Sequence, residues 1–280
     1  MLKKVTSILG TISLICFSFY YTDSAIDVIK KTDPIMQQII EYSEEYGNTS
    51  IEPILINNNI IPGIKGSIVD IDKSYTKMKS FGNFDESLIV FKEVYPEISI
   101  MNNYENYIVS GNNQKDNVSL IFVLEDSSFV EEILSILNKK NIKVTFFIND
   151  DLFNDAVDLL KLMLLSGHRI EFYSDKYDVS TIKKYNTILK SISDDSLNYC
   201  YTTFKNDKVL ENCKHEELHT IIPTIITDFY PYNDIKNNLN NGSIISLKNN
   251  KNTVRELSSI INYILQKGKK IITLEKLLEE

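Results

Sequence analysis

NVSLIFVL, residues 117–124, is an almost unbroken apolar run with the length of a buried β-strand. A helical spacing of apolar residues follows it, from Val130 to Leu137. A second strand-like run, NIKVTFFI, then occupies residues 141–148. A strand, a helix and a strand in this order are typical of a βα unit, in which the two strands run parallel.

The same alternation continues toward the C-terminus. Strands are predicted at residues 168–174, 197–202, 218–226, 242–247 and 270–274, and helices at about 152–165, 179–192, 207–213 and 253–267. An unbroken βα series of this length predicts a parallel sheet or barrel over residues 116–280. Residues 25–115 are less regular and are expected to form a small α+β region, with one helix at 33–46.

Composition and the N-terminus limit the classes of function. The chain has 280 residues and a net charge of −8, which argues against binding to nucleic acid. Lys3 and Lys4 precede an uncharged run over residues 5–21, so residues 1–24 are interpreted as a signal sequence or a membrane anchor. The rest of the chain is therefore expected outside the cytoplasm, membrane-anchored or secreted. In that compartment Cys200 and Cys213 are expected to form a disulfide, with two buried free thiols as the alternative.

One short motif points to metal chemistry. HEELH, residues 215–219, has the His-Glu-x-x-His spacing of zinc proteases. Those enzymes need both histidines on one face of a continuing helix, but Thr220, Ile221, Ile222 and Pro223 follow and favour a strand. We therefore interpret HEELH as a turn between a helix and a strand, in which the two imidazoles do not share a metal.

Four segments of the βα series resemble the polysaccharide deacetylase family, which has a NodB-homology domain. They are VSLIFVL with EEILSILNKKNIKVTFFI (residues 118–124 and 131–148), SGHRIEFYS (166–174), NGSIISLKNN (241–250) and SSIINYILQKGKKIITLEKLLEE (258–280). The resemblance implies an irregular (β/α) barrel whose site lies at the C-terminal ends of the strands. It also implies an enzyme that removes N-acetyl groups from glycans with a divalent metal, held by one aspartate and two histidines.

The residues that would carry this chemistry are different in this chain. Val123 and Leu124 stand where the family has its two aspartates, Tyr173 and Tyr177 where it has its two histidines, and Lys248 where it has its last histidine. Phenol groups are poor ligands for a divalent zinc-like ion compared with imidazole. The sequence therefore predicts a degenerate site with no metal or other cofactor.

Two hypotheses about function follow from the resemblance. The first is a non-catalytic extracytoplasmic protein that binds cell-wall glycan or an envelope protein. The glycan would bind at a set of aromatic side chains: Phe172, Tyr173, Tyr177, Tyr199 and Tyr201. The second is an active N-deacetylase with an atypical zinc site that uses Glu125, Asp126 and His168.

Overall fold

The computed structural model describes residues 32–280, so the expected signal or anchor segment lies outside the described part of the chain. The chain forms two compact units. The larger one contains residues 51–64 and 95–280, and the described part of the smaller one contains residues 32–50 and 65–94. This division differs from the expected boundary between residues 115 and 116, because two earlier segments join the larger unit. None of the helices within residues 32–280 has the length and hydrophobicity of a membrane span.

The smaller unit contains two helices and a two-stranded sheet. Helix α2 (Pro34–Glu45) packs against α3 (Ile71–Lys79), and β3 (Gly66–Val69) pairs with β4 (Phe91–Val94) in antiparallel orientation. Asp33 caps this helix, since its carboxylate accepts a hydrogen bond from the Ile35 amide at 2.9 Å, and Pro34 opens the helix. The core of this unit consists of Met36, Ile39, Val69, Tyr75 and Met78.

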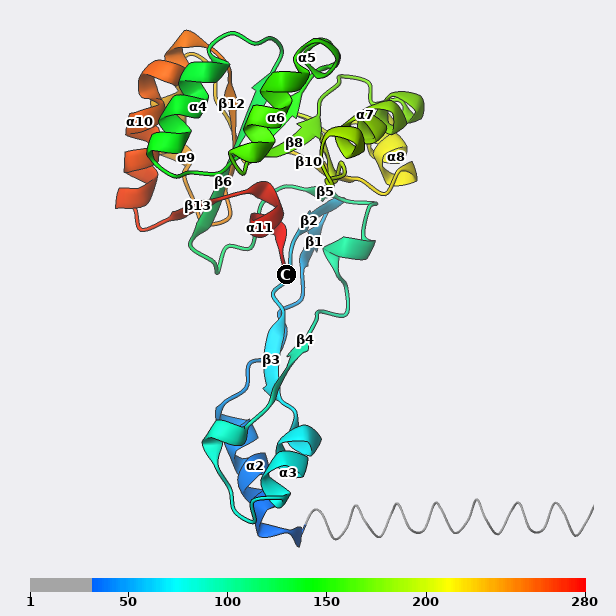
Figure 1. Cartoon of the computed structure of the whole chain (residues 1–280), viewed down its shortest axis with the longest axis vertical. Helices are drawn as coiled ribbons and strands as arrows, with labels where there is room; N and C mark the ends of the chain where they lie inside the picture. The colour runs from blue at the N-terminus through cyan, green and yellow to red at the C-terminus, as the bar shows by residue number, and fades with distance from the viewer. Residues whose placement is uncertain (1–31) are drawn as a thin grey trace, which may run out of the picture. The chain divides into compact units, whose positions relative to one another are not determined.

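The larger unit is built around two sheets (Figure 1). In the six-stranded sheet, the strands follow the order β11-β12-β6-β7-β8, and β13 pairs with the first part of β6; all pairs are parallel. The strands are β6 (Asn117–Leu124), β7 (Thr145–Ile148), β8 (Arg169–Phe172), β11 (Ile225–Ile226), β12 (Ile244–Lys248) and β13 (Lys270–Ile272).

The five-stranded sheet has the order β1-β2-β5-β10-β9. Its strands are β1 (Ile54–Ile56), β2 (Asn59–Ile61), β5 (Tyr107–Ile108), β9 (Tyr199–Tyr201) and β10 (His219–Ile221). Only β1 and β2 pair in antiparallel orientation within this sheet. Residues 54–61 and 107–108 lie before the predicted domain start at 116, yet they complete the sheet.

Helices cover the outer face of the six-stranded sheet, as the ribbons of α4 and α10 in Figure 1 show. The helices of this unit are α4 (Val130–Lys139), α5 (Asp150–Asp155), α6 (Val157–Leu165), α7 (Val179–Ile192), α8 (Asp207–His215), α9 (Pro231–Asn238), α10 (Lys251–Gln266) and α11 (Leu274–Leu278). The arrangement is an irregular (β/α) barrel, as the sequence predicts.

Strand β6 contributes side chains to two apolar cores, one on each face of the sheet. Phe122 and Leu124 face the helices and belong to the larger apolar core, whereas Ile121 and Val123 face the space between the two sheets. Successive side chains of a strand point to opposite faces, so a strand buried on both sides becomes apolar throughout. Leu274, Leu277 and Leu278 of α11 fill the inner core from one end of the barrel.

Side chains bridge the neighbouring edges of the two sheets, where β8 and β9 are not paired as strands. The carboxyl group of Glu171 on β8 accepts hydrogen bonds from the backbone amides of Asn198 (2.9 Å) and Tyr199 (3.1 Å). The Tyr177 hydroxyl donates to the Phe172 carbonyl at 2.9 Å and accepts from the Tyr201 amide at 2.9 Å. We call this edge the β8–β9 seam.

Two elements differ from the sequence-based expectation. The single strand predicted at residues 218–226 is split into β10 and β11, which belong to different sheets. Pro223 lies at the break, where it has no amide to donate to either sheet. The helix predicted at 152–165 is divided at Ala156 into α5 and α6.

Candidate functional site

A cavity lies at the C-terminal ends of the parallel strands, where the resemblance places the site. It has a volume of about 380 Å³, and its lining includes Val123, Glu125, Tyr173, Tyr201, Ser246 and Lys248. We call it the mouth groove. Two adjoining cavities, of about 430 and 250 Å³, share Tyr173 with it, so this ring forms a wall of all three.

Two tyrosines shape the mouth groove. The rings of Tyr173 and Tyr201 meet edge to face, with centroids 5.7 Å apart. The Tyr173 hydroxyl donates to the Asp175 carboxylate at 2.8 Å, and the Tyr201 hydroxyl lies 3.0 Å from the Ser246 hydroxyl. Burial raises the pKa of both phenols above the ordinary value, so both remain protonated at neutral pH. The groove therefore offers aromatic surface with neutral hydroxyl groups.

At the two positions where the family has aspartates, one side chain of this protein faces the groove and the other faces the core. Val123 lines the groove, while Leu124 is fully buried in the core that faces the helices. The alternation along β6 imposes this difference. Neither aliphatic side chain offers an atom that binds a metal.

The side chains at the other three altered family positions, Tyr173, Tyr177 and Lys248, are also not suited to hold a metal. Tyr177 is buried, and its hydroxyl is used on both sides by the β8–β9 seam. The Tyr173 hydroxyl is bound to Asp175. Lys248 is exposed, with its ammonium nitrogen 3.7 Å from Asp228. The donor set that the family uses for its metal is thus replaced by groups that do not fit a divalent ion.

The structure does not bring together the three residues of the atypical zinc site. Glu125 and Asp126 follow the C-terminal end of β6, whereas His168 precedes the first residue of β8. Along the strand direction, Glu125 and His168 are five residues apart in the register of the sheet, which is about 16 Å at 3.3 Å per residue. His168 is buried, accepts a hydrogen bond from the Val144 amide at 3.2 Å, and has a pKa lowered by burial to about 4.

The two carboxylates at the mouth have different surroundings. Asp126 accepts hydrogen bonds from the Ser128 amide (2.7 Å) and from the Asn249 side chain (3.0 Å), and the Ser128 bond contributes most to lowering its pKa. Asp126 therefore organises the loop after β6. Glu125 lines the mouth groove and one adjoining cavity.

Only part of the predicted aromatic set reaches the mouth groove. Phe172 and Tyr177 are buried in the helix-facing core, where Phe172 stacks on Tyr185 with centroids 4.3 Å apart. Tyr199 lines a different cavity at the opposite ends of the strands. The corrected set at the groove is Tyr173 and Tyr201.

Sequence reasoning missed several residues around the mouth. Phe204 lines an adjoining cavity, and Ile226 and Asn249 line the groove. Phe229 and Tyr230, between β11 and α9, are large exposed aromatic residues. Ile226 is the last residue of a predicted strand and the others follow predicted strands, so position at or after the C-terminal end of a parallel strand is the signal that could have identified them.

The interpretation of HEELH agrees with the structure. Helix α8 ends at His215, whose exposed ring lies 2.7 Å from the Glu216 carboxylate. His219 opens β10, and its ring stacks on Tyr104 with centroids 4.5 Å apart. Over residues 32–280, no three histidine, cysteine or acidic side chains gather in a group able to hold a metal ion. The structure also joins Cys200 and Cys213 in a disulfide bond, the pairing expected from the sequence.

Comparisons with known proteins agree with this fold. A family model described as polysaccharide deacetylase matches residues 110–199. The uncharacterized protein YlxY of Bacillus subtilis (strain 168) is 25% identical over 281 residues, which cover 91% of this chain and 86% of YlxY. These findings, with the structures below, confirm the resemblance to the polysaccharide deacetylase family with altered catalytic motifs.

Solved structures show the same architecture. A CE4 family pseudoenzyme from Bacillus anthracis has a TM-score of 0.69 at 20% identity, covering 89% of this chain and 96% of that one. A mutant CE4 family pseudoenzyme with restored enzymatic activity gives the same TM-score and identity, covering 89% and 99%. Bacillus subtilis PdaA, a family 4 carbohydrate esterase, has a TM-score of 0.55 at 18% identity, covering 64% and 87%.

Proposed function

We propose that this chain is a polysaccharide-deacetylase-like protein that has lost the family's hydrolytic chemistry and binds cell-wall glycan in the mouth groove. The observation that carries the proposal is the state of Tyr177. At a position where the family uses a metal-binding histidine, its buried hydroxyl holds the Phe172 carbonyl and the Tyr201 amide. A former ligand position has become part of the barrel wall.

The lining of the mouth groove suits a sugar polymer. Sugar rings stack their C–H faces on aromatic side chains and hydrogen-bond through their hydroxyl groups to polar neighbours. Tyr173 supplies a half-buried ring shared by three cavities, and the exposed side chains of Thr203 and Lys248 supply polar groups beside it. A chain of several sugars can lie along these joined cavities with Tyr173 at the centre.

The relatives support a non-catalytic role. The wild-type and mutant structures of one similar protein are both described as a CE4 family pseudoenzyme, so the scaffold is found in a protein described in this way. We further propose that the protein acts outside the cytoplasm, either secreted or tethered to the membrane through residues 1–24. The two lysines and the uncharged run at the N-terminus support this placement.

Glycan binding is tested by sedimenting the full-length protein with purified peptidoglycan. We expect saturable co-sedimentation that Tyr173→Ala weakens at least tenfold, because the stacking platform is removed. Tyr46→Ala, which alters an exposed tyrosine of the smaller unit, is the matched control and should bind like the unchanged protein.

Two results would overturn this proposal. Release of acetate from N-acetylated glycan would show that the protein is an active deacetylase. No binding to peptidoglycan, together with capture of an envelope protein that Tyr173→Ala does not affect, would move the function to protein recognition away from the groove.

A further inference from the structure

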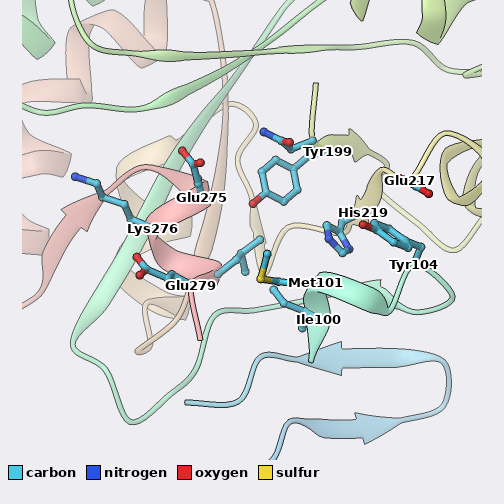
Figure 2. Close-up of a pocket in the computed structure, with 11 residues that line it drawn as sticks. Ile100, Met101, Tyr104, Tyr199, Glu217, His219, Glu275, Lys276 and Glu279 are labelled. Atoms are coloured by element: carbon cyan, nitrogen blue, oxygen red, sulfur yellow. The ribbon is translucent and has the colours of Figure 1, made fainter. Parts of the chain in front are cut away.

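A second cavity, drawn in Figure 2, lies at the N-terminal ends of β9 and β10, whereas the mouth groove lies at the C-terminal strand ends. It has a volume of about 570 Å³ and borders the first residues of β9 and β10 and the helix α11. We call it the basal cavity. It is lined by Ile100, Met101, Tyr104, Asn198, Tyr199, His219 and Leu278, with Glu217, Glu275, Lys276 and Glu279 also bordering it.

The walls of the basal cavity are fixed by contacts outside it. The Glu280 side chain accepts hydrogen bonds from the Ile100 amide at 3.0 Å and from the Ser99 hydroxyl, which holds the turn that carries Met101. On the other side, the Glu171 carboxyl group accepts hydrogen bonds from the amides of Asn198 and Tyr199. A preformed cavity of this size is typical of small-ligand sites.

Tyr199 presents an unused polar group to this cavity. The residue is only 8% exposed, but its hydroxyl oxygen is open to solvent and has no protein hydrogen-bond partner within the described chain. Figure 2 shows the hydroxyl oxygen directed into the space between Glu275 and Met101. A hydroxyl that faces a cavity and is not used by the protein is free to hydrogen-bond a ligand with a matching polar group.

The other side of the cavity is aromatic. The rings of Tyr104 and His219 stack at 4.5 Å with an interplanar angle of 21°, and the Tyr199 ring lies 6.1 Å from His219. Burial lowers the pKa of His219 to about 4, so the imidazole is neutral at physiological pH. Three uncharged rings therefore surround one cavity, which favours a ligand with C–H faces.

The charged residues around the cavity limit the sign of the ligand. Three carboxylates, Glu217, Glu275 and Glu279, border it against one ammonium group, Lys276. Arg169 lies 3.5 Å from Glu275 but also pairs with Asp195, so it compensates only part of this charge. An anionic ligand is disfavoured by this balance. A purely apolar ligand would leave the Tyr199 hydroxyl unpaired.

We infer that the basal cavity is a second carbohydrate site, which binds a single neutral or amino-sugar ring stacked on the Tyr104–His219–Tyr199 rings and hydrogen-bonded to the Tyr199 hydroxyl. The site is independent of the mouth groove and shares no lining residue with it. A protein with both sites can hold two parts of a glycan, or two chains, at opposite ends of one barrel.

Methionine methyl NMR of the full-length protein tests this site directly. Met101 borders the cavity, while Met36 and Met78 lie in the smaller unit and Met163 lies in the helix-facing core. Titration with N-acetylglucosamine and with glucosamine is expected to shift the Met101 signal in a saturable way, in the millimolar range typical of so small a ligand. The methyl signals of Met36, Met78 and Met163 serve as internal controls.

Two substitutions separate a binding role from a structural one. Tyr199→Phe keeps the ring and removes a hydroxyl that has no protein partner, so the fold is retained and sugar binding is expected to weaken about threefold to tenfold. Tyr173→Phe makes the same chemical change in the mouth groove and should leave the Met101 titration unchanged. Glucuronic acid, an anionic sugar, should bind at least tenfold more weakly than glucosamine.

The inference is overturned if Met101 does not respond to either sugar, or if glucuronic acid binds as well as glucosamine. It also fails if Tyr199→Phe leaves the affinity unchanged. Because the readout is local to the basal cavity, a failure here is separate from any failure of peptidoglycan binding by the mouth groove.

Discussion

Substitution of Tyr177 by phenylalanine tests whether the former ligand position now holds the barrel together. The ring and most of its volume remain, and the change removes only the hydroxyl that joins the Phe172 carbonyl to the Tyr201 amide. Both backbone groups are buried in the β8–β9 seam, so neither gains water when the hydroxyl is lost.

The size of the effect follows from these two orphaned groups. A buried donor or acceptor left without a partner costs about 1–3 kcal/mol, so Tyr177→Phe, which orphans two groups, is expected to lower the free energy of unfolding by roughly 2–6 kcal/mol. This is a large part of the roughly 5–15 kcal/mol that keeps a typical domain folded. With a urea dependence of about 2 kcal/mol per molar, the unfolding midpoint would fall by about 1–3 M.

Urea unfolding is best followed by hydrogen exchange of the segment around β9, because this readout reports the larger unit alone. Tyr199→Phe is the matched control: it lies on the same seam and loses a hydroxyl that has no partner among the described residues. We expect it to leave the midpoint nearly unchanged. Equal midpoints for Tyr177→Phe and Tyr199→Phe would refute the structural role given to Tyr177.

Three further predictions concern the same unit. Leu124→Asp is expected to lower the free energy of unfolding by more than about 4 kcal/mol and to abolish folding, because it buries an unpaired carboxylate. Val123→Asp places the carboxylate at the groove and should retain the native circular dichroism spectrum. If Val123→Asp unfolds the protein and Leu124→Asp does not, the assignment of the two faces of β6 is wrong. Burial raises the pKa of Glu171 to about 8 from an ordinary 4.5, so its contribution to stability is complete below pH 4.5 and is lost by a few kcal/mol as the pH rises to about 8. Glu171→Gln should therefore flatten the fall in unfolding free energy over this range, and a steeper fall would contradict the assigned pKa. Replacing Cys200 and Cys213 by alanine opens a loop with a sequence separation of 13 and should lower stability by about 3 kcal/mol; an unchanged urea midpoint would argue against the bond.

The sequence predicted the elements whose signals are local. Strand β6 spans residues 117–124 and helix α7 spans 179–192, as expected from their apolar patterns. The opposite faces of Phe172 and Tyr173 also follow from the period of two in a strand, which would have removed Phe172 from the predicted glycan set. His168 precedes a strand and therefore belongs at the barrel end opposite the site, a rule that would have excluded it from the atypical zinc site.

Contacts between residues that are distant in the chain could not be predicted from the sequence. Nothing near Tyr177 indicates that its hydroxyl meets the amide of Tyr201, since the two belong to different strand-to-helix segments. The same holds for the basal cavity, which draws residues from around 100, 199, 219 and 278. The sequence pattern places residues 54–61 in the N-terminal α+β region, because β1 and β2 are short and join the sheet only through pairing with the distant strand β5.

The position of α11 in the chain has a consequence for how the protein is made. Leu274, Leu277 and Leu278 fill the space between the sheets, and β13 pairs with the start of β6 more than 150 residues earlier. The inner core of the larger unit is therefore incomplete until these late residues have been synthesised. Contacts between such distant segments also form slowly. Folding of the larger unit can therefore finish only after the C-terminal residues have been made, and a chain that stops before α11 would leave the inner core open.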